Sequence, residues 1–480
     1  MENSARTLDR IFHPNSVGII GASDNPFKMG YRCVASMVEI GFEGDVYPIN
    51  EKVDSICGLQ TYAALSDVPG DVDLVIIVVP ARHVPDALNA AARKRAAGAV
   101  IITAGFKEID DEGGASLQAE ITRIADDAGI KIIGPNTFGM VNMGAKLNAS
   151  FTPIFNHLKL GSISMLGQSG GVCHLVAFQA IDEGVGMNKV IGLGNRCNLS
   201  FAELIEYLGE DPETHTIIIY LEGIEGPRAL MDAARKVSRR KPIVGLKVGH
   251  SEAASRAVLS HTGSLSGKHS LYYAAFEQAG VVPAQDTVEL LDVAKIVSIA
   301  VPPAGDRVAV MSFQAGPGIM LTDLCVSHGL RMARLSPATV ARLKGLWPDL
   351  TIRTNPVDLA FLTDMGAFGE VTRLVLKDEN VDAVIVFYLD VFSFFTAALS
   401  EELVPLAREV PKPIVVCANF PVTLSTKETE EGLAKFQDNG ISVYPLPERA
   451  VKALKGLVCR GKVERSFLQC GAQDYSTFST

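Results

Sequence analysis

A repeated alternation of short apolar runs with helix-length segments is the feature that most constrains the fold of this chain. Between Ser16 and about Asn142 the apolar runs are VGIIGAS, DVYPIN, DVDLVIIVVP, GAVIITAGF and IKIIGPN. Strand-sized runs separated by helical segments are typical of a parallel sheet covered by helices. The region is therefore predicted to be doubly wound. Its helix from Pro85 to Arg95 is expected to stop at Gly98 in a left-handed conformation.

Two further series of the same kind follow. The second contains GSISMLG, NKVIGLG, TIIIYLEG and KPIVGLKVG, and the third contains RVAVMSF, DAVIVFYL, KPIVVCAN and ISVYP. Pro302, Pro303 and Gly305 form a rigid break between them. The fold class is therefore predicted to be α/β with three doubly wound domains. The expected divisions are residues 1–142, 143–300 and 305–457, with a loosely ordered surface tail at 458–480.

Length and charge limit the classes of function. The 480 residues fit about three domains at roughly 100 to 200 residues each. The net charge is −10 and no basic run exceeds Arg239–Lys241, so nucleic acid and anionic membranes are not expected partners. The eight cysteines include no Cys-x-x-Cys pair, and no apolar run approaches the roughly 20 residues of a membrane span. These features predict a cytoplasmic protein without a metal site.

The first apolar run leads into Gly21 and the string GASDNPFKMG, which is followed by a helix. Backbone N–H groups at such a turn, the helix start and Lys28 together favour an anionic ligand. An ordinary strand-to-helix turn is the plain alternative. Gly18 and Gly21 do not form the G-x-G-x-x-G pattern of NAD sites, although Glu51 could imitate a ribose-binding acid, so NAD stays a minor alternative.

Glycine-containing turns also precede helices in the second and third series. LGQSGGV contains Ser169, Gly170 and Gly171, and SFQAGPG contains Gly316 and Gly318. Small residues at a helix start let a phosphate approach the backbone N–H groups closely. Tight packing of a strand against a helix selects the same residues. The two turns are therefore candidate phosphate sites.

His261 lies in the glycine-flanked string HTGSLSG, where an imidazole can approach a phosphoryl donor without obstruction. Neutral imidazole is a competent nucleophile near pH 7. A structural histidine is the plain alternative, since the chain has nine. Glu222 follows a buried strand directly, where α/β folds place functional groups, and a carboxylate bonded to one imidazole nitrogen leaves the other free. A helix cap or an exposed acid is the alternative for Glu222.

Several motifs resemble one known family. GASDNPFKMG, VYPIN, VVPA, TAGFKE and GPNTFGMVN occur in the order seen in the CoA-binding domain of ADP-forming acetyl-CoA synthetases and of succinyl-CoA synthetase α subunits. HTGSLSG is similar to the phosphorylated loop of that family. The resemblance covers residues from about 10 to 455. It implies a Rossmann-like CoA-binding domain followed by two flavodoxin-like ligase domains.

The resemblance also implies roles for individual residues. His261 carries the phosphoryl group and Glu222 orients it. The implied phosphate contacts are Ser169, Gly170, Gly171, Gly316 and Gly318. The implied CoA contacts are Gly21, Ala22, Ser23, Lys28, Val79, Pro80, Ala104, Gly105 and Asn136.

The implied activity is that of an NDP-forming acyl-CoA synthetase, which reversibly converts a carboxylic acid, CoA and NTP into acyl-CoA, NDP and phosphate. An acyl phosphate and a phosphohistidine link the two sides of the reaction. No ATP-grasp sequence is apparent after residue 305. The expectation is therefore a hetero-oligomer in which a separate ATP-grasp β subunit holds the nucleotide and Mg²⁺.

The chain departs from the family pattern at several positions. Thr137 replaces a usual Cys, Asn198 and Ser200 replace usual acids, and Phe313 replaces a usual Asn. These changes keep open a non-catalytic CoA-binding module, and an NAD-dependent oxidoreductase is a weaker alternative. The acid, the choice of ADP or GDP and the direction of the reaction stay open.

Overall fold

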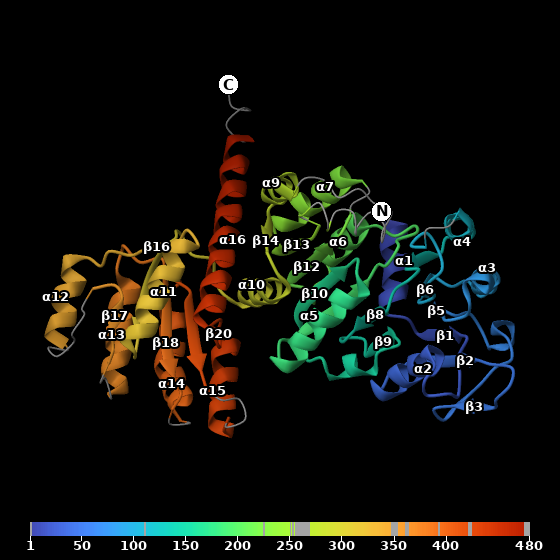
Figure 1. The fold of residues 1–480 in the computed structure, drawn as a ribbon, viewed down its shortest axis with the longest axis horizontal. Coiled ribbons are helices and arrows are strands. Elements are labelled where there is room, and N and C mark those ends of the chain that lie inside the picture. Colours follow the sequence, from blue (N-terminus) through green and yellow to red (C-terminus); the bar gives the residue numbers. More distant parts are fainter. Residues whose placement is uncertain are drawn as a thin grey trace. The chain divides into compact units, whose positions relative to one another are not determined.

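The structure is a computed structural model. It describes residues 2–109, 112–223, 226–249, 251, 254, 269–346, 354–360, 364–391, 394–420 and 425–474. The chain forms two compact units, Met1–Thr287 and Val288–Thr480, and each is described by itself. The first unit contains a five-stranded sheet, a seven-stranded sheet and a two-stranded hairpin, and the second unit contains a six-stranded sheet (Figure 1).

The first sheet is wholly parallel and has the order β2-β1-β5-β6-β7. Its strands are the short apolar runs of the first series, buried because helices cover both faces. Their bounds are β1 (Ser16–Ile20), β2 (Asp45–Ile49), β5 (Leu74–Ile77), β6 (Gly98–Ile101) and β7 (Lys131–Ile133). A hairpin, β3 (Ser55–Ile56) with β4 (Leu59–Gln60), follows β2.

The helices of the first sheet are α1 (Glu2–Phe12), α2 (Met29–Glu39), α3 (Val84–Arg93) and α4 (Glu112–Ala128). Helix α3 does not use Gly98 as its stop, contrary to the sequence prediction. Arg95 takes the left-handed conformation instead, with φ of 55°. Gly98 begins β6, and a Cβ atom there would lie 2.5 Å from the Ile11 side chain of α1. Packing against α1, rather than a helix stop, requires a small residue at this position.

The second sheet has the order β14-β13-β12-β10-β11-β8-β9. Its parallel strands are β10 (Leu160–Gly167), β11 (Met187–Gly192), β12 (Thr216–Leu221), β13 (Ile243–Lys247) and β14 (Val281–Pro283). The antiparallel strands β8 (Gly139–Asn142) and β9 (Leu147–Ser150) extend its edge beside β11. The division expected at residue 142 therefore falls at the end of a strand that pairs with the second sheet.

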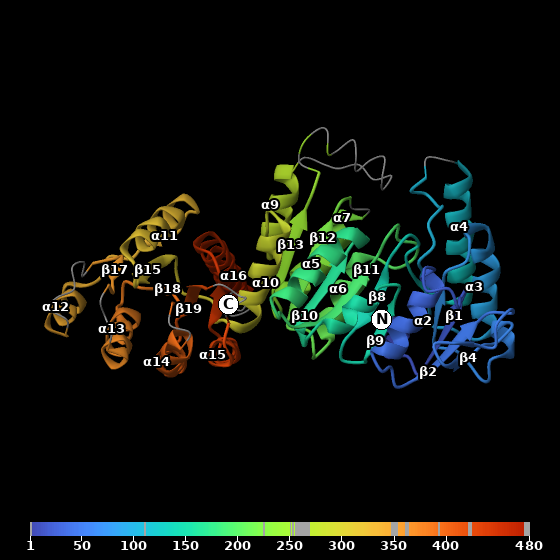
Figure 2. The ribbon, with the colours of Figure 1, turned by 60° about the horizontal axis from the view of Figure 1, so that its bottom comes forward.

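Helices cover the second sheet on both faces. Helix α5 (Gly170–Asp182) contacts β10 and β11, as Figure 2 shows. Helices α6 (Phe201–Glu210), α7 (Pro227–Ser238) and α9 (His269–Ala279) contact one another in succession. One continuous hydrophobic core contains residues of both sheets, from Val17 and Ile19 to Ile217 and Ile219. This shared core explains why the two sheets form one compact unit.

The second unit contains a six-stranded sheet with the main order β16-β15-β18-β19-β20, in which β17 also pairs with β15. Its strands are β15 (Arg307–Ser312), β16 (Arg331–Met332), β17 (Val357–Asp358), β18 (Ala383–Leu389), β19 (Ile414–Asn419) and β20 (Ser442–Tyr444). Its helices are α10 (Thr287–Ile299), α11 (Ala315–Ser327), α12 (Pro337–Leu346), α13 (Met365–Lys377), α14 (Phe395–Glu409), α15 (Lys427–Asp438) and α16 (Pro447–Asp474).

The region after Arg460 differs from the loosely ordered tail expected there. It continues α16 as far as Asp474. Arg460 is itself buried, and Arg465 donates a hydrogen bond of 2.8 Å to the carbonyl of Pro303. Earlier in the same helix, Arg449 forms a salt bridge with the buried Asp292 of α10. These contacts extend the helix where the sequence shows no clear period.

All three sheets share one strand order. Counted along the chain within each sheet, and leaving aside β17 and the β8–β9 hairpin, the main strands lie in the order 2-1-3-4-5. This is the doubly wound order in which the chain reverses direction between the first and third strands, and ligands bind outside the carboxyl ends at that point. The predicted class of three doubly wound α/β domains is confirmed. Among the described helices, none is both long enough and apolar enough to cross a bilayer.

Candidate functional site

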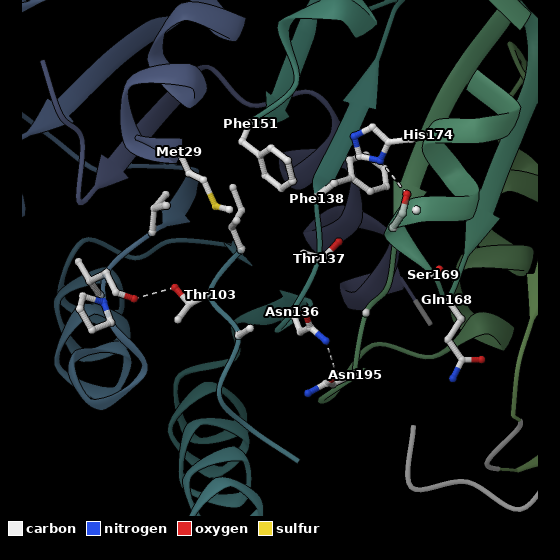
Figure 3. Close-up of a pocket in the computed structure, with 18 of the residues that line it drawn as sticks. Met29, Thr103, Asn136, Thr137, Phe138, Phe151, Gln168, Ser169, His174 and Asn195 are labelled. Atoms are coloured by element: carbon white, nitrogen blue, oxygen red, sulfur yellow. Dashed lines mark hydrogen bonds between the residues drawn. The ribbon is translucent and has the colours of Figure 1, made fainter. Parts of the chain in front are cut away.

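A pocket of about 700 Å³ lies in the first unit, where loops at the carboxyl ends of both sheets meet. In Figure 3, Met29 and Thr103 lie on one side, and Gln168, Ser169 and His174 lie on the other. Its lining residues are Met29, Val78, Val79, Pro80, Ile102, Thr103, Ala104, Asn136, Thr137, Phe138, Phe151, Gln168, Ser169, Gly170, Gly171, His174, Gly194, Asn195 and Glu222.

The turn after β1 brings the start of α2 to the pocket. Gly21 has φ of 93°, which glycine adopts without strain. A Cβ atom on Gly30 would lie 2.1 Å from the carbonyl oxygen of Gly21, so only glycine permits this approach. Exposed Lys28 occupies the N-cap position of α2, and the next residue, Met29, lines the pocket.

The other predicted residues of this turn have local roles. The Ser23 hydroxyl accepts a hydrogen bond of 3.2 Å from the Asn25 N–H. The carbonyl of Ala22 accepts one of 2.8 Å from the side chain of Asn50. Gly21, Ala22, Ser23 and Lys28 are not among the residues that line the pocket, and they form the turn leading to Met29.

The ends of β5 and β6 supply one wall of the pocket. Val79, Pro80 and Ala104 line it, as the sequence predicted. The Thr103 hydroxyl donates a hydrogen bond of 2.7 Å to the carbonyl of Val79 and joins the two loops (Figure 3). Gly105 does not line the pocket. It adopts φ of 108° and turns the chain away.

Glu108, which the sequence prediction did not select, holds this turn in place. Its carboxylate accepts hydrogen bonds from the backbone N–H groups of Gly105, at 2.5 Å, and Phe106, at 3.2 Å. It also accepts one from the side chain of Asn195, which comes from the second sheet. Burial opposes ionisation, but these hydrogen bonds outweigh it and hold the pKa of Glu108 below its usual range.

The loop after β7 contributes Asn136, Thr137 and Phe138. Asn136 has φ of 57°, which Asn tolerates better than most residues, and its amide donates to the Asn195 side chain at 3.4 Å. The Thr137 hydroxyl donates to the carbonyl of Gly192 at 2.6 Å and accepts from the N–H of Gly139. Thr137, one of the noted departures from the expected pattern, therefore stabilises the junction between the two sheets.

The start of α5 forms the facing wall. Ser169 occupies the N-cap position but makes no capping hydrogen bond with its side chain, and Gly170 and Gly171 follow. All three residues line the pocket, so the first N–H groups of α5 lie at its edge. A helix start with small residues is suited to bind an anion.

Glu222 follows β12 and lines the same pocket, with 8% of its surface exposed. The side-chain oxygen of Gln168 accepts hydrogen bonds from the backbone N–H groups of Glu222, at 3.0 Å, and Gly223, at 3.1 Å. These bonds link the ends of β10 and β12. The Tyr220 hydroxyl donates to the Glu222 carboxylate at 3.4 Å, and burial together with this acid raises the pKa of Tyr220. His261 lies outside the described residues.

Several lining residues were missed as candidates by sequence reasoning, among them Phe138, Phe151, His174 and Asn195. Phe138 stands inside the motif GPNTFGMVN, and Asn195 lies just before the noted residues Asn198 and Ser200, but neither had an assigned role. His174 is one of nine histidines and has no distinctive flanking pattern. The loop after β9 brings Phe151 into the pocket, and no local pattern predicts that pairing.

In the second unit, Gly316 and Gly318 lie in the first turn of α11, after β15. Phe313 packs against Phe368, with ring centroids 5.4 Å apart, and against Phe395, at 5.0 Å. Phe313, another of the noted departures, thus belongs to an aromatic cluster before α11.

The two other departures from the family pattern stabilise local structure. Asn198 donates to Asp126 and to the carbonyl of Ile130, both at 2.8 Å. Ser200 is the N-cap of α6 and forms a capping box with Glu203. Neither residue lines the pocket.

Three protein families match the chain in order. Residues 15–143 match the CoA binding domain, residues 160–297 match the succinyl-CoA ligase like flavodoxin domain, and residues 308–461 match the ligase-CoA domain. Together with a pocket between strand ends, these matches define a CoA ligase.

Comparisons over the whole chain indicate the same class of protein. The chain is 36% identical to the alpha subunit of ADP-forming acetate–CoA ligase II from Pyrococcus furiosus, covering 95% of this chain and 98% of that protein. It is also 36% identical to ADP-forming acetate–CoA ligase I from Archaeoglobus fulgidus, covering 94% of this chain and 63% of that longer protein. The chain belongs to the family of ADP-forming acetate–CoA ligases.

A solved structure shows the same fold. It is the dinucleotide-forming acetyl-coenzyme A synthetase 1 of Candidatus Korarchaeum cryptofilum in complex with phosphate and ADP. The TM-score is 0.85 at 31% identity, covering 96% of this chain and 98% of that chain.

Proposed function

We propose that this chain is the CoA-binding and phosphohistidine-carrying subunit of an NDP-forming acyl-CoA synthetase, with His261 as the phosphoryl carrier. The observation that carries the proposal is the pocket in which the start of α5 and Glu222 meet the loops of the CoA binding domain. The chain is a subunit of an acid–thiol ligase that interconverts acid, CoA and NTP with acyl-CoA, NDP and phosphate.

The pocket residues fit the chemistry of CoA. Val79, Pro80 and Ala104 offer an apolar wall to the pantetheine arm, and Asn136 offers an amide near its thiol end. Lys28 and the start of α2 suit the phosphates of the nucleotide end, because a cation and a helix N-terminus both favour anions. Gly21, Ala22, Ser23 and Gly105 shape the turns that bring these groups together.

In the direction of NTP synthesis, the proposed chemistry proceeds through three transfers. Phosphate attacks the thioester carbonyl, which forms an acyl phosphate and releases the CoA thiol. An imidazole nitrogen of His261 then attacks the phosphorus, and the carboxylic acid leaves. Phosphohistidine passes its phosphoryl group to NDP and restores the free imidazole.

Two groups on the second sheet support this assignment. The N–H groups at Ser169, Gly170 and Gly171 can hold the phosphate oxygens as the transfer proceeds. The Glu222 carboxylate is proposed to accept the N–H of one imidazole nitrogen of His261. The other nitrogen is then the nucleophile.

The nucleotide and Mg²⁺ are proposed to bind a separate ATP-grasp β subunit, giving a cytoplasmic hetero-oligomer. The three matched domains occupy residues 15–461 without such a module, and the longer relative extends beyond the matched region. Gly316 and Gly318, in the first turn of α11, are proposed as a second phosphate contact.

Phosphohistidine mapping tests the proposal. The complete chain and its partner are incubated with labelled NTP and a panel of carboxylic acids, and acid-labile phosphate is located by peptide mapping. We expect label on His261 and none in the His261→Ala variant. Label on another residue, or label that persists in the variant, would contradict the mechanism.

Ligand titration of the chain alone tests the proposed binding of CoA. CoA should raise the melting temperature and NAD should not. Stabilisation by NAD in place of CoA would contradict the proposed ligand. Binding of CoA without phosphorylation of any histidine would instead favour a non-catalytic CoA-binding module.

A further inference from the structure

Gln168 lies between the end of β10 and the start of α5, and its side chain is held in the wall of the pocket. It is 5% exposed and lines the pocket. One end of its amide meets the backbone N–H groups of Glu222, at 3.0 Å, and Gly223, at 3.1 Å. Because a backbone N–H can only donate, this end is the oxygen and the other end is Nε2. The chain itself thus fixes the position of the amide nitrogen.

This nitrogen has no acceptor of its own. Among the residues that the structure describes, the bonds of the Gln168 side chain are the two that its oxygen accepts. In Figure 3, the amide nitrogen lies on the side nearer to Asn195 and the oxygen lies on the far side. A buried donor without an acceptor costs free energy. Nε2 is therefore suited to an acceptor that enters the pocket with a ligand.

Other side-chain donors of the pocket already have partners within the chain. Asn195 donates to Glu108 and Gln118, and the Thr137 hydroxyl donates to a backbone carbonyl. Both ring nitrogens of His174 lie within 2.8 Å of an oxygen atom of the chain. Gln168 differs from these residues because one end of its amide is held in place and the other end stays available.

The charges around the pocket indicate which ligand Nε2 meets. Of the described residues that line the pocket, none is Lys or Arg, and Glu222 is the one carboxylate among them. A phosphoryl group at the start of α5 is therefore stabilised by N–H dipoles and not by a cationic side chain from these residues. It also has to be kept apart from the Glu222 carboxylate. An amide that holds the backbone of Glu222 and directs its own N–H groups elsewhere meets both requirements.

We propose that Gln168 is a catalytic residue, and that Nε2 donates a hydrogen bond to a phosphoryl oxygen during transfer between the acyl phosphate and His261. This inference rests on the proposed function. In that step the bond from the imidazole nitrogen to phosphorus forms, and the bond from phosphorus to the carboxyl oxygen breaks. Its electron pair leaves with the carboxylate, while the proton on the other imidazole nitrogen stays shared with Glu222. A donor that is already in position stabilises the phosphoryl oxygens without reorganisation.

Gln168→Glu separates the donor from the acceptor. A carboxylate oxygen still accepts from the N–H groups of Glu222 and Gly223, but the atom in place of Nε2 no longer donates. We expect labelling of His261 to slow by about 10- to 100-fold, the effect of one hydrogen bond to a charged group. Quench-flow measurement uses the assembled enzyme, labelled inorganic phosphate and the CoA thioester of an acid that supports turnover of the wild type.

The wild type separates the two proposals. If the wild-type enzyme labels no histidine, the proposed function fails. If it labels His261 and Gln168→Glu does so at the same rate, only the role of Nε2 fails.

Phosphate binding gives a second readout, which a purely structural role would not move. Inorganic phosphate is titrated into the complete chain and followed by phosphorus NMR, with CoA present to fill its own phosphate sites. Gln168→Glu should weaken phosphate binding by about 10-fold or more and leave the affinity for CoA unchanged. Gln278→Glu, at an exposed glutamine of α9, adds the same charge outside the pocket and is the matched control.

Gln168→Met serves if Gln168→Glu does not fold. It removes the donor and the acceptor together, so it should weaken phosphate binding and also lower the melting temperature, because two buried N–H groups lose their acceptor. Phosphate affinity equal to that of the wild type in a folded Gln168 variant would overturn the inference. Gln168 would then act only by holding the backbone of Glu222.

Discussion

The carboxyl ends of β10 and β12 in the first unit and those of β15 and β18 in the second unit are equivalent positions in two sheets of the same strand order. At both positions the first strand runs through a turn into a helix that contains glycines, α5 or α11. At both positions an acid, Glu222 or Asp390, follows the third strand. The shared strand order therefore places a helix start and an acid at equivalent strand ends in both sheets.

The side chains use the two positions differently. Glu222 lines the pocket, together with the first residues of α5. Asp390 instead accepts hydrogen bonds from the backbone N–H and the hydroxyl of Thr396, and it thereby stabilises the start of α14. Phe313 fills the turn before α11 with an aromatic contact to Phe395. The comparison teaches that strand order selects where a site can form, while neighbouring side chains decide whether the acid after the third strand faces a pocket.

The largest effect is expected from a substitution at the first position, the carboxyl end of β12. Glu222→Gln should slow phosphorylation of His261 by about 10- to 100-fold, the usual cost of removing a carboxylate that orients a reactive histidine. Quench-flow measurement of labelled phosphohistidine in the assembled enzyme gives the rate. The variant should keep its binding of CoA. A rate equal to that of the wild type would remove Glu222 from the mechanism.

The second prediction tests the equivalent position. Thr396→Val removes the hydroxyl that bonds Asp390 and also accepts from the Tyr388 hydroxyl at 2.9 Å. Leaving these buried groups unpaired should lower the free energy of unfolding by about 1–3 kcal/mol. Urea denaturation measures that loss. The rate of His261 phosphorylation should not change. A large fall in this rate for a folded variant would mean that Asp390, like Glu222, acts in catalysis.

The third prediction compares glycines at the two turns. A Cβ atom on Gly167 would lie 2.2 Å from the sulfur of buried Cys173, whereas one on Gly316 would have no atom within 4 Å. Gly167→Ala should therefore cost about 1–3 kcal/mol of stability, and Gly316→Ala should be neutral or stabilise by up to about 1 kcal/mol. Thermal unfolding of both variants checks this. Equal losses would contradict the packing described for α5.

The smallest effect concerns Glu108, which links the first position to the CoA binding domain. Its pKa is below the ordinary value of 4.5, so its hydrogen bonds contribute fully above that pH and are lost as the pH falls toward the lower folded value. Glu108→Gln should lower the melting temperature most near neutral pH, and the difference should shrink below pH 4.5. Glu120→Gln, at an exposed acid of α4, is the control and should show no such trend. A difference that grows on acidification would contradict the assigned direction.

Local patterns of the sequence determined much of this protein. Short apolar runs and glycine turns predicted three α/β domains, because strand burial and left-handed turns depend on neighbouring residues. The resemblance to a known family selected Val79, Pro80, Ala104 and Asn136, and a glycine turn marked Ser169–Gly171. All of these residues line the pocket. The roles assigned to these residues stay predictions, and His261 rests on its motif alone.

Only the tertiary structure decided which further side chains meet these groups. His174 gains its fixed orientation from Thr152, 22 residues earlier, and Glu108 meets Asn195 across 87 positions. Helix α16 continues past Arg460 because distant contacts hold it, and not because of a local period. Sequence spacing carries no information about such pairs. They form when the packed core brings separate loops together, and the ring contacts of His174 with Phe138 and Phe151 arise in this way.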